Sequence, residues 1–279
     1  MSQFDRKITC EIGTAGQEGT LIDGLRIKFH IEKTKGSSIN KAEIEIYNLT
    51  KETINKLSKI DNHVILSAGY NDMGYIQQIF SGTMSSAVTI EDPPERIYTI
   101  EALDGGKKLR ETYESYSYDE GTQIESIISD LQIDLDFPSG RLPVIAETLP
   151  NGWSYIGDVR SALTSVLNMV DYDWYLQDEE FIIVRKGETS SKQAVSLTPE
   201  SGLIGSPEPE DDSYNELRPK KRKGYKVKCL LNPLINPAGQ VEIVSNDIDG
   251  FYKVYNLTHD GDNYGGEFIT EFDCKEFVV

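Results

Sequence analysis

The chain has 279 residues, with 28 Lys or Arg against 46 Asp or Glu, and a formal net charge of −18 at pH 7. A charge this negative argues against general nucleic-acid binding, which uses cations to displace phosphate counterions, and against an anionic membrane surface as partner. No stretch of the sequence approaches the roughly 20 consecutive apolar residues of a membrane-spanning helix.

The cysteines indicate a reducing compartment. Cys10, Cys229 and Cys274 are far apart and odd in number, which is typical of free thiols and not of a disulfide scaffold. The segment Met1–Cys10 lacks the apolar core of a secretory signal peptide. We therefore expect synthesis and assembly in a host cytoplasm, without a membrane anchor.

The N-terminal part of the chain predicts strands. Apolar and polar residues alternate over residues 25–32, 41–47 and 97–102, and a period of two with one apolar side marks a half-buried strand. Clusters of Gly, Asn and Asp separate these segments. One short helix is expected behind Thr50, which suits an N-cap, with Ile54 and Leu57 on its apolar face.

The middle of the chain changes to a mixed pattern. Thr122–Glu125 has the sequence of a capping box, and apolar residues follow it at helical spacing. A second helix is predicted over residues 159–170. Two short strands, residues 173–176 and 180–185, are joined by a tight polar turn. This pattern predicts a small α/β domain over residues 108–190.

A loop-rich stretch follows, and then strands return. Residues 199–219 combine prolines with acidic residues and predict a loop. Further alternating segments predict strands near residues 225–231, 241–245 and 252–256, with a closing strand near 268–277. Both β sections follow one order, which is strand, connector, strand and long hairpin. Their residue identity is too low to establish a repeat from sequence alone.

A basic run ends the loop. It consists of Lys220, Lys221, Arg222 and Lys223. Inside a strongly acidic chain such a run is most often a solvated segment that offsets the acids before it. As a functional site it favours a protein interface over DNA, and we expect the segment from 199 to 223 to become ordered against a neighbouring protein.

The sequence predicts no catalytic, metal or cofactor site. His259-Asp260-Gly261-Asp262 brings three potential metal ligands together, but His30 and His63 lie in separate strand regions, so we interpret the motif as a hairpin turn. No Gly-x-Ser-x-Gly elbow, Walker A loop, Rossmann fingerprint or Cys-x-x-Cys pair is present. Acidic residues are too abundant for any glycosidase pair to stand out.

A series of short motifs in a fixed order resembles the baseplate hub proteins of contractile-tailed phages and related tail machines. The motifs extend over nearly the whole chain. They are residues 46–50, 68–70, 79–82 and 102–105 for the first domain, 121–122 and 173–176 for the middle, and 202–207, 230–233, 250–254 and 259–262 for the last.

The resemblance implies a mainly β fold, with two tube-like β-barrel domains flanking the small α/β domain. The first barrel would span residues 1–107, the α/β domain 108–190, and the linker with the second barrel 191–279. In that family two barrels per chain let a homotrimer imitate a six-part ring. The ring joins the hexameric tail tube to the central spike within the virion tail baseplate, beside other baseplate proteins.

The same resemblance implies a structural protein and not an enzyme, with no cofactor. DNA would pass through the ring during genome ejection without specific binding, and we expect an acidic lumen. Two alternatives remain at this point. One is a peptidoglycan-hydrolysing or carbohydrate-binding tail-tip module, and the other is a tube or adaptor protein of a bacterial contractile injection system.

Overall fold

A computed structural model gives the fold. It describes residues 5–14, 16–36, 38–71, 75–105, 109, 111–135, 143–191, 193–210 and 224–277. The chain is mainly β, as predicted. Its strands are β1 (Arg6–Gly13), β2 (Thr20–Ile22), β3 (Ile27–Lys33), β4 (Lys41–Tyr47), β5 (His63–Tyr70), β6 (Tyr75–Asp92), β7 (Glu95–Leu103), β8 (Tyr113–Tyr118), β9 (Trp153–Asp158), β10 (Tyr172–Gln177), β11 (Glu180–Arg185), β12 (Ala194–Leu197), β13 (Leu203–Glu210), β14 (Gly224–Leu230), β15 (Gln240–Val244), β16 (Asp249–Asp262) and β17 (Phe268–Glu276). The helices are α1 (Lys51–Leu57), α3 (Ile124–Leu135) and α4 (Val159–Met169), with a 3-10 turn, η2 (Pro199–Ser201).

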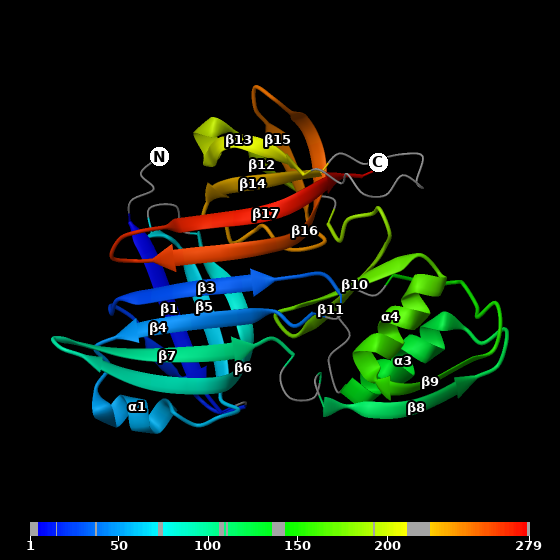
Figure 1. Cartoon of the computed structure of the whole chain (residues 1–279), viewed down its shortest axis with the longest axis horizontal. Coiled ribbons are helices and arrows are strands. Elements are labelled where there is room, and N and C mark those ends of the chain that lie inside the picture. Colours follow the sequence, from blue (N-terminus) through cyan, green and yellow to red (C-terminus); the bar gives the residue numbers. More distant parts are fainter. Residues whose placement is uncertain are drawn as a thin grey trace.

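A single 13-stranded sheet dominates the molecule, in the order β13-β14-β17-β16-β3-β4-β7-β6-β5-β1-β2, with β15 beside β16 and β12 beside β15 (Figure 1). This corrects the expectation of two separate barrels, since in the described part of the chain neither half closes on itself. The reason is the pairing of β3 with β16, which fuses β1–β7, the first half of the sheet, to β12–β17, the second half.

The two halves share one plan. β3-β4-β7-β6-β5 in the first half matches β13-β14-β17-β16-β15 in the second. The two long hairpins, β6–β7 and β16–β17, each carry a bulge at the same point. The first bulge lies between Met84 and Ser86, and the second between Val254 and Asn256. A bulge is a specific local feature, so its recurrence indicates common construction that residue identity does not reveal. The outer strands differ, because β1 is antiparallel to β5 whereas β12 is parallel to β15.

Backbone hydrogen bonds repeat at the same place. Met84 is bound by the connector before β5: its O accepts from Asp61 N at 3.1 Å, and its N donates to Asn62 O at 2.8 Å. Val254 is bound in the same way by the connector before β15, where its O accepts from Ala238 N at 2.9 Å and its N donates to Gly239 O at 3.0 Å. Met84 and Val254 are therefore equivalent positions, which fixes the alignment of the halves.

Each half packs its own apolar cluster, and alternation along the strands explains both. In β3 the side chains of Ile27, Phe29 and Ile31 point inward while those between them face solvent. The first cluster also contains Leu231 and Phe268 from the second half. The sheet junction therefore combines a hydrogen-bonded ladder with shared apolar packing.

The small α/β unit, residues 109–185, has its own core, in which α3 and α4 pack with the antiparallel pair β8–β9 and the β10–β11 hairpin (Figure 1). Both predicted helices are confirmed, but the capping box is wrong. The Thr122 hydroxyl donates to the Asp119 carbonyl at 2.7 Å, and the first helical N–H groups bond the Gln123 carbonyl. Gln123 is held in a strand-like bridge to Thr148, so the helix begins only after it.

The other helix predictions and the loop have mixed outcomes. Thr50 is confirmed as the N-cap of α1, and Ile54 and Leu57 are buried. The predicted loop over 199–219 is wrong in its first part, because residues 203–210 form β13. Its prolines are tolerated there because β13 is an edge strand. Lys220–Lys223 lie outside the described residues. No helix in the described ranges is long and apolar enough to cross a membrane.

Candidate functional site: the charged face of the sheet and the junctions beside it

One face of the large sheet is polar and open to solvent. Alternation places Lys28, His30 and Glu32 of β3 on this face. Registered neighbours continue it, since His30 lies opposite Asp260 on one side and Glu43 on the other. Side chains on the remaining strands complete the charged face, and they are Lys41, Glu45, Glu101, Lys226, Lys228, Glu271 and Asp273.

Cations on the charged face are matched by carboxylates on neighbouring strands. Lys28 Nζ lies 3.3 Å from Glu45, Lys41 Nζ 3.3 Å from Glu101, and Lys228 Nζ 3.1 Å from Glu271. These pairs are exposed, so each contributes little to stability. Carboxylates outnumber the lysines on this face, so the face stays negatively charged after the lysines are paired.

His30 belongs to the same pattern. Its ring nitrogens lie 2.7 Å from Asp260 and 3.3 Å from Glu32. Partial burial lowers the pKa of His30, but the hydrogen bonds to Asp260 and Glu32 outweigh that effect and raise the pKa above its ordinary value. When His30 is protonated, its imidazolium pairs with two acids, Asp260 and Glu32, that would otherwise repel each other across β3 and β16.

A buried carboxylate joins the small α/β unit to the first half of the sheet. Asp104 accepts the backbone N–H groups of Asp178 and Glu179, each at 2.9 Å. These two residues form the β10–β11 turn with φ of 53° and 68°, a region that L side chains rarely adopt. Asn40 Nδ2 donates to Asp104 Oδ2 at 3.0 Å and to Leu176 O at 2.6 Å. The turn is thus fixed by the side chain that directly follows β7 and the one that directly precedes β4.

Asp178 connects this junction to the second half. Its carboxylate accepts from Ser81 N at 3.0 Å and from Lys33 Nζ at 3.1 Å. Lys33 is 1% exposed, and its Nζ also donates to Asn236 Oδ1 at 3.0 Å. All three parts of the chain therefore meet at one buried ammonium group. Burial and the nearby Asp178 raise the pKa of Asp104 to about 6.

Lys253 makes a second polar contact between the small unit and the second half. It is fully buried, with its Nζ 5.5 Å from the Tyr175 ring centroid and 5.6 Å from that of Tyr255. Lys35 Nζ lies 2.9 Å from Asp173, which is 6% exposed. A cation between aromatic faces is stabilised by their quadrupoles. The Lys253 contact holds β10 against β16, and the Lys35 ion pair holds β10 against the segment after β3.

The two halves of the sheet are also joined at the end of β16. Arg26 Nη2 lies 2.8 Å from Asp262 Oδ2, and its guanidinium stacks 4.4 Å from the Tyr47 ring centroid. Asn263 accepts from Ile27 N at 2.9 Å and donates to Leu25 O at 2.8 Å. The β16–β17 hairpin is therefore held against β3 by side chains as well as by the ladder.

His259 corrects a prediction. The motif 259–262 was expected in a hairpin turn, but it forms the end of β16. His259 is fully buried, and its Nδ1 lies 2.9 Å from Thr270 Oγ1. Burial lowers the pKa of His259 to about 3. Among the described residues no group of three or more His, Cys, Asp or Glu side chains is placed to hold a metal ion.

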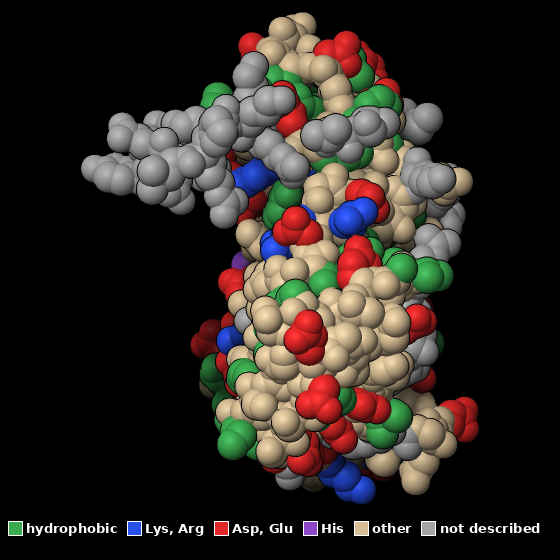
Figure 2. Space-filling model, turned by 90° about the vertical axis from the view of Figure 1, so that its right-hand side faces the viewer, with side chains coloured by type: hydrophobic (Ala, Val, Ile, Leu, Met, Phe, Trp, Pro, Cys, Tyr) green, Lys and Arg blue, Asp and Glu red, His purple; other side chains and the backbone are tan. Residues whose placement is uncertain are grey.

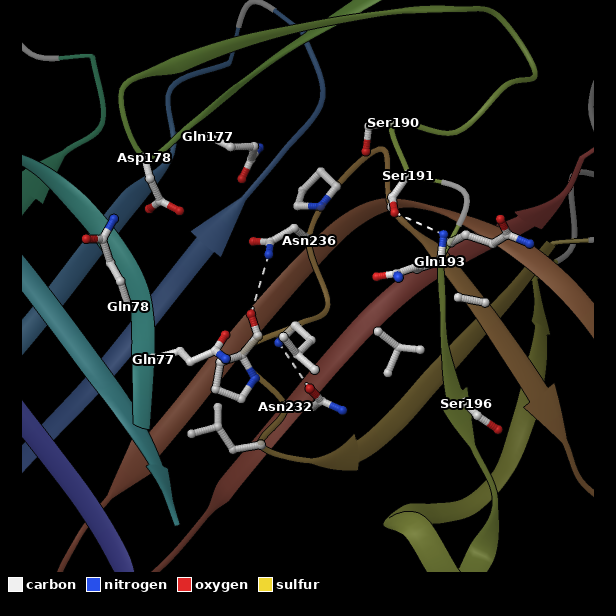
Figure 3. A pocket seen from close by; sticks show the side chains of 18 of the residues that line it. Gln77, Gln78, Gln177, Asp178, Ser190, Ser191, Gln193, Ser196, Asn232 and Asn236 are labelled. Carbon is white, nitrogen blue, oxygen red and sulfur yellow. Dashed lines mark hydrogen bonds between the residues drawn. The ribbon is translucent and has the colours of Figure 1, made fainter. Parts of the chain in front are cut away.

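A groove of about 880 Å³ opens beside the junction (Figure 3). Its walls come from β6, the β10–β11 turn, the segment before β12, and the connector between β14 and β15. Amides and hydroxyls dominate among the labelled side chains, including Gln77, Gln177, Ser191 and Asn232. Such a lining suits hydrogen bonding to a peptide or a sugar. Two acidic residues, Asp178 and Glu180, also line the groove. The Asp178 carboxylate already accepts from Lys33 and Ser81.

The end of the molecule formed by the small unit is acidic. Figure 2 shows acidic side chains spread over this end, while basic ones gather mainly towards the sheet above it. Apolar side chains are scattered on it, among them Ile133, Val144 and Ile156, which are 74%, 84% and 85% exposed. Scattered exposure of this kind is ordinary for a protein surface.

Family comparison decides the class of this protein. The model of the baseplate hub gp41 family matches residues 7–274. The chain belongs to the baseplate hub gp41 family. This confirms the resemblance seen in the sequence and makes the protein a structural component of a tail baseplate. A search of curated protein sequences finds no match.

Solved structures show a similar fold at low sequence identity. The 43 kDa tail protein of prophage MuSo2 from Shewanella oneidensis is 9% identical, with a TM-score of 0.70 over 98% of this chain and 97% of that one. A tail protein from Neisseria meningitidis MC58 is 12% identical, with a TM-score of 0.69 and 96% of each chain covered.

A third similar structure comes from a secretion system. The E. coli c3393 protein, a component of the type VI secretion system described as similar to phage T4 tail proteins gp27 and gp5, is 10% identical. Its TM-score is 0.62 over 96% of this hub chain and 77% of that one. At such identities the likeness shows the fold alone, and that fold is shared by phage tails and a secretion machine.

The sequence missed the side chains that join the parts of this hub. Lys33, Asn40, Asp104 and Arg26 were not singled out. One signal was available, because the alternation of β3 places Lys33 on the inward side, and a lysine at an inward position of a strand predicts a buried polar partner. The predicted interface residues Lys220, Lys221, Arg222 and Lys223 lie outside the described residues.

Proposed function

We propose that three copies of this chain form a ring in the tail baseplate, which joins a hexameric tail tube to a central spike and leaves a channel for DNA. One observation carries the proposal. Each chain contains two halves of equivalent strand order with the same bulge. A trimer therefore presents six similar units, which is the arrangement that matches six-fold symmetry on one side and three-fold symmetry on the other.

The halves act as two tube-like domains in this proposal. We propose residues 1–107 and 191–279 as these domains, with residues 108–190 as the small unit outside the ring. The intrachain pairing of β3 with β16 already places two tube-like units side by side in one sheet. Curvature of that sheet into a closed wall would come from the neighbouring copies.

The charged face would line the channel. Exposed charges act over a Debye length of about 8 Å at physiological salt, so a wall rich in carboxylates repels passing DNA weakly. Weak repulsion favours transit, because cationic contacts to phosphate would have to be broken repeatedly. The pairing of Lys28, Lys41 and Lys228 with carboxylates supports this, since these lysines are already engaged.

Lys220, Lys221, Arg222 and Lys223 are proposed to contact a neighbouring baseplate protein. Changing all four to Ser should reduce the yield of assembled tails while the purified chain keeps its fold. A normal tail yield would contradict the assembly role. Neither this run nor the charged face is proposed to catalyse a reaction, and no cofactor is proposed.

Imaging of assembled tails tests the proposed ring. We expect three copies of this chain in one layer, with pseudo-six-fold density from their paired halves. A layer with six copies, or a single copy on the axis, would contradict the proposal. A zymogram on peptidoglycan tests the enzymatic alternative independently, and clearing by the purified chain would favour that alternative.

A further inference from the structure

Two strand edges of the sheet, one on β6 and one on β13, have no partner strand among the described residues. β6 pairs with β5 over residues 75–83 and with β7 over residues 83–92. Beyond Met84, the edge of β6 that faces away from β7 has no partner strand in the described part of the chain. β13 pairs only with β14 among the described strands, so its outer edge is open as well.

The second half shows what occupies such an edge. β16 pairs with β15 over residues 249–253, and its continuation, residues 257–262, pairs antiparallel with β3 over residues 33–28. In the first half, β6 has the same two-part construction, but its continuation has no such partner among the residues that the structure describes. The intrachain contact between β16 and β3 is therefore a template for the missing one.

Shared features fix the register of the template. Met84 and Val254 are equivalent, and both precede the bulge, so residues 87–92 of β6 correspond to residues 257–262 of β16. On the other side, Glu32 pairs with Lys41 in β4 as Glu210 pairs with Gly224 in β14. The outer edge of β13 thus corresponds to the edge of β3 that β16 occupies.

We propose that β6, over residues 85–92, pairs antiparallel with β13 of a second copy, with Val88 opposite Glu210 and Ile90 opposite Glu208. This inference rests on the proposed ring and names its intersubunit contact. The pairs correspond to Thr258 with Glu32 and Asp260 with His30 within one chain. Each copy offers one β6 edge and one β13 edge, so the contact is heterologous and closes as a ring.

Exposed apolar side chains on β6 and β13 support a contact in which a second copy covers these edges. Val88 and Ile90 are 56% and 52% exposed, although both lie on a strand, and an open apolar edge is a template for pairing. Ile204 on β13 is 38% exposed and would lie near Asp92. Pro207 and Pro209 remove two N–H donors from β13, so the ladder would rely mainly on N–H groups of β6 and carbonyls of β13. This reduced donor set restricts pairing with unrelated strands.

Disulfide trapping in assembled tails tests the inference. The variant Val88→Cys with Glu210→Cys should link chains to one another, and more than half should migrate as a covalent trimer under mild oxidation. Thr258→Cys with Glu32→Cys is the matched positive control, because it places the same pair within one chain and should give a linked monomer. Val88→Cys with Glu271→Cys is the negative control, since β14 and β13 separate β17 from the contact.

The native thiols should not form disulfides with the introduced cysteines. Cys10, Cys229 and Cys274 are buried, and burial raises the pKa of Cys10 and of Cys229 to about 12. A covalent trimer from the Val88–Glu210 variant alone would support the contact. Unlinked chains beside a linked positive control would overturn it. Imaging of the same tails separates the two claims, because a three-copy ring without the link refutes the strand contact, while a six-copy ring refutes the ring itself.

Discussion

Arg26 and Asp262 form an ion pair across the place where the two halves of the sheet meet. The guanidinium Nη2 lies 2.8 Å from the carboxylate, and the Asp262 side chain is only 10% exposed. The pair holds the end of β16 against β3, where the backbone ladder between the halves ends. It links the two similar halves by side chains at the end of that ladder.

Substitution Asp262→Asn should loosen this contact. The amide keeps the shape but removes the charge that binds Arg26, so we expect the free energy of unfolding to fall by about 1–2 kcal/mol. Urea denaturation measures the change. The control is Lys28→Gln, which removes an exposed pair with Glu45 on the same sheet and should change stability by less than about 1 kcal/mol. Equal effects of the two variants would show that the Arg26 pair has no special role.

Asp104 should make stability fall as pH rises from 4 to 6. Its folded pKa is about 6, above the unfolded value of about 3.9. In this window the folded chain holds the Asp104 proton more tightly, so its contribution is full below pH 4 and is lost as pH approaches 6. Relative to Asp104→Asn, the wild type should lose about 2–3 kcal/mol over that range. A wild-type advantage that grows with pH would contradict the raised pKa.

His259 should act in the opposite direction. Burial places its folded pKa at about 3, below the unfolded value of about 6.5. The unfolded chain therefore gains a proton first as pH falls, and the folded state loses stability through that window. Between pH 6.5 and pH 5 the wild type should lose about 2 kcal/mol relative to His259→Gln. Parallel curves for the two proteins would show that His259 titrates normally in the fold.

The open edge of β6 should govern assembly and leave folding intact. Replacing both Val88 and Ile90 with Lys puts cations on the edge, which discourages strand pairing. We expect an unchanged thermal midpoint for the isolated chain and at least a tenfold loss of assembled tails. Ile156→Lys on β9, an exposed position remote from the edge, should assemble normally. Normal assembly of the double variant would argue against the β6 contact.

Local sequence pattern predicts most of the strands and helices, but it does not predict how the strands pair into one sheet. The alternation of residues 25–32 and 41–47 and the helical spacing after Thr122 all correspond to observed elements. Thr122 failed as a cap because Gln123 is held in a bridge to Thr148, a contact distant in sequence. The prolines and acids of residues 203–210 predict a loop, but they form strand β13 because a sheet edge tolerates proline.

The side chains at the junctions could not be predicted from the sequence, because their partners are also distant along the chain. Asp104 acts through the backbone of Asp178 and Glu179, and Arg26 acts through Asp262, far along the chain. Neither pairing leaves a local spacing pattern. The sequence indicates one order of parts in both halves, but the equivalence of individual positions follows only from the structure, through the matching bulges after Met84 and Val254.

Cryo-electron microscopy of an assembled tail tests the central claim most directly. We expect three copies in a ring, with β6 of each copy beside β13 of the next. The charged face should form the lumen wall, with His30, Glu43 and Asp260 pointing inward. Six copies in the layer, or a lumen lined by the opposite face or mainly by Lys and Arg, would contradict it.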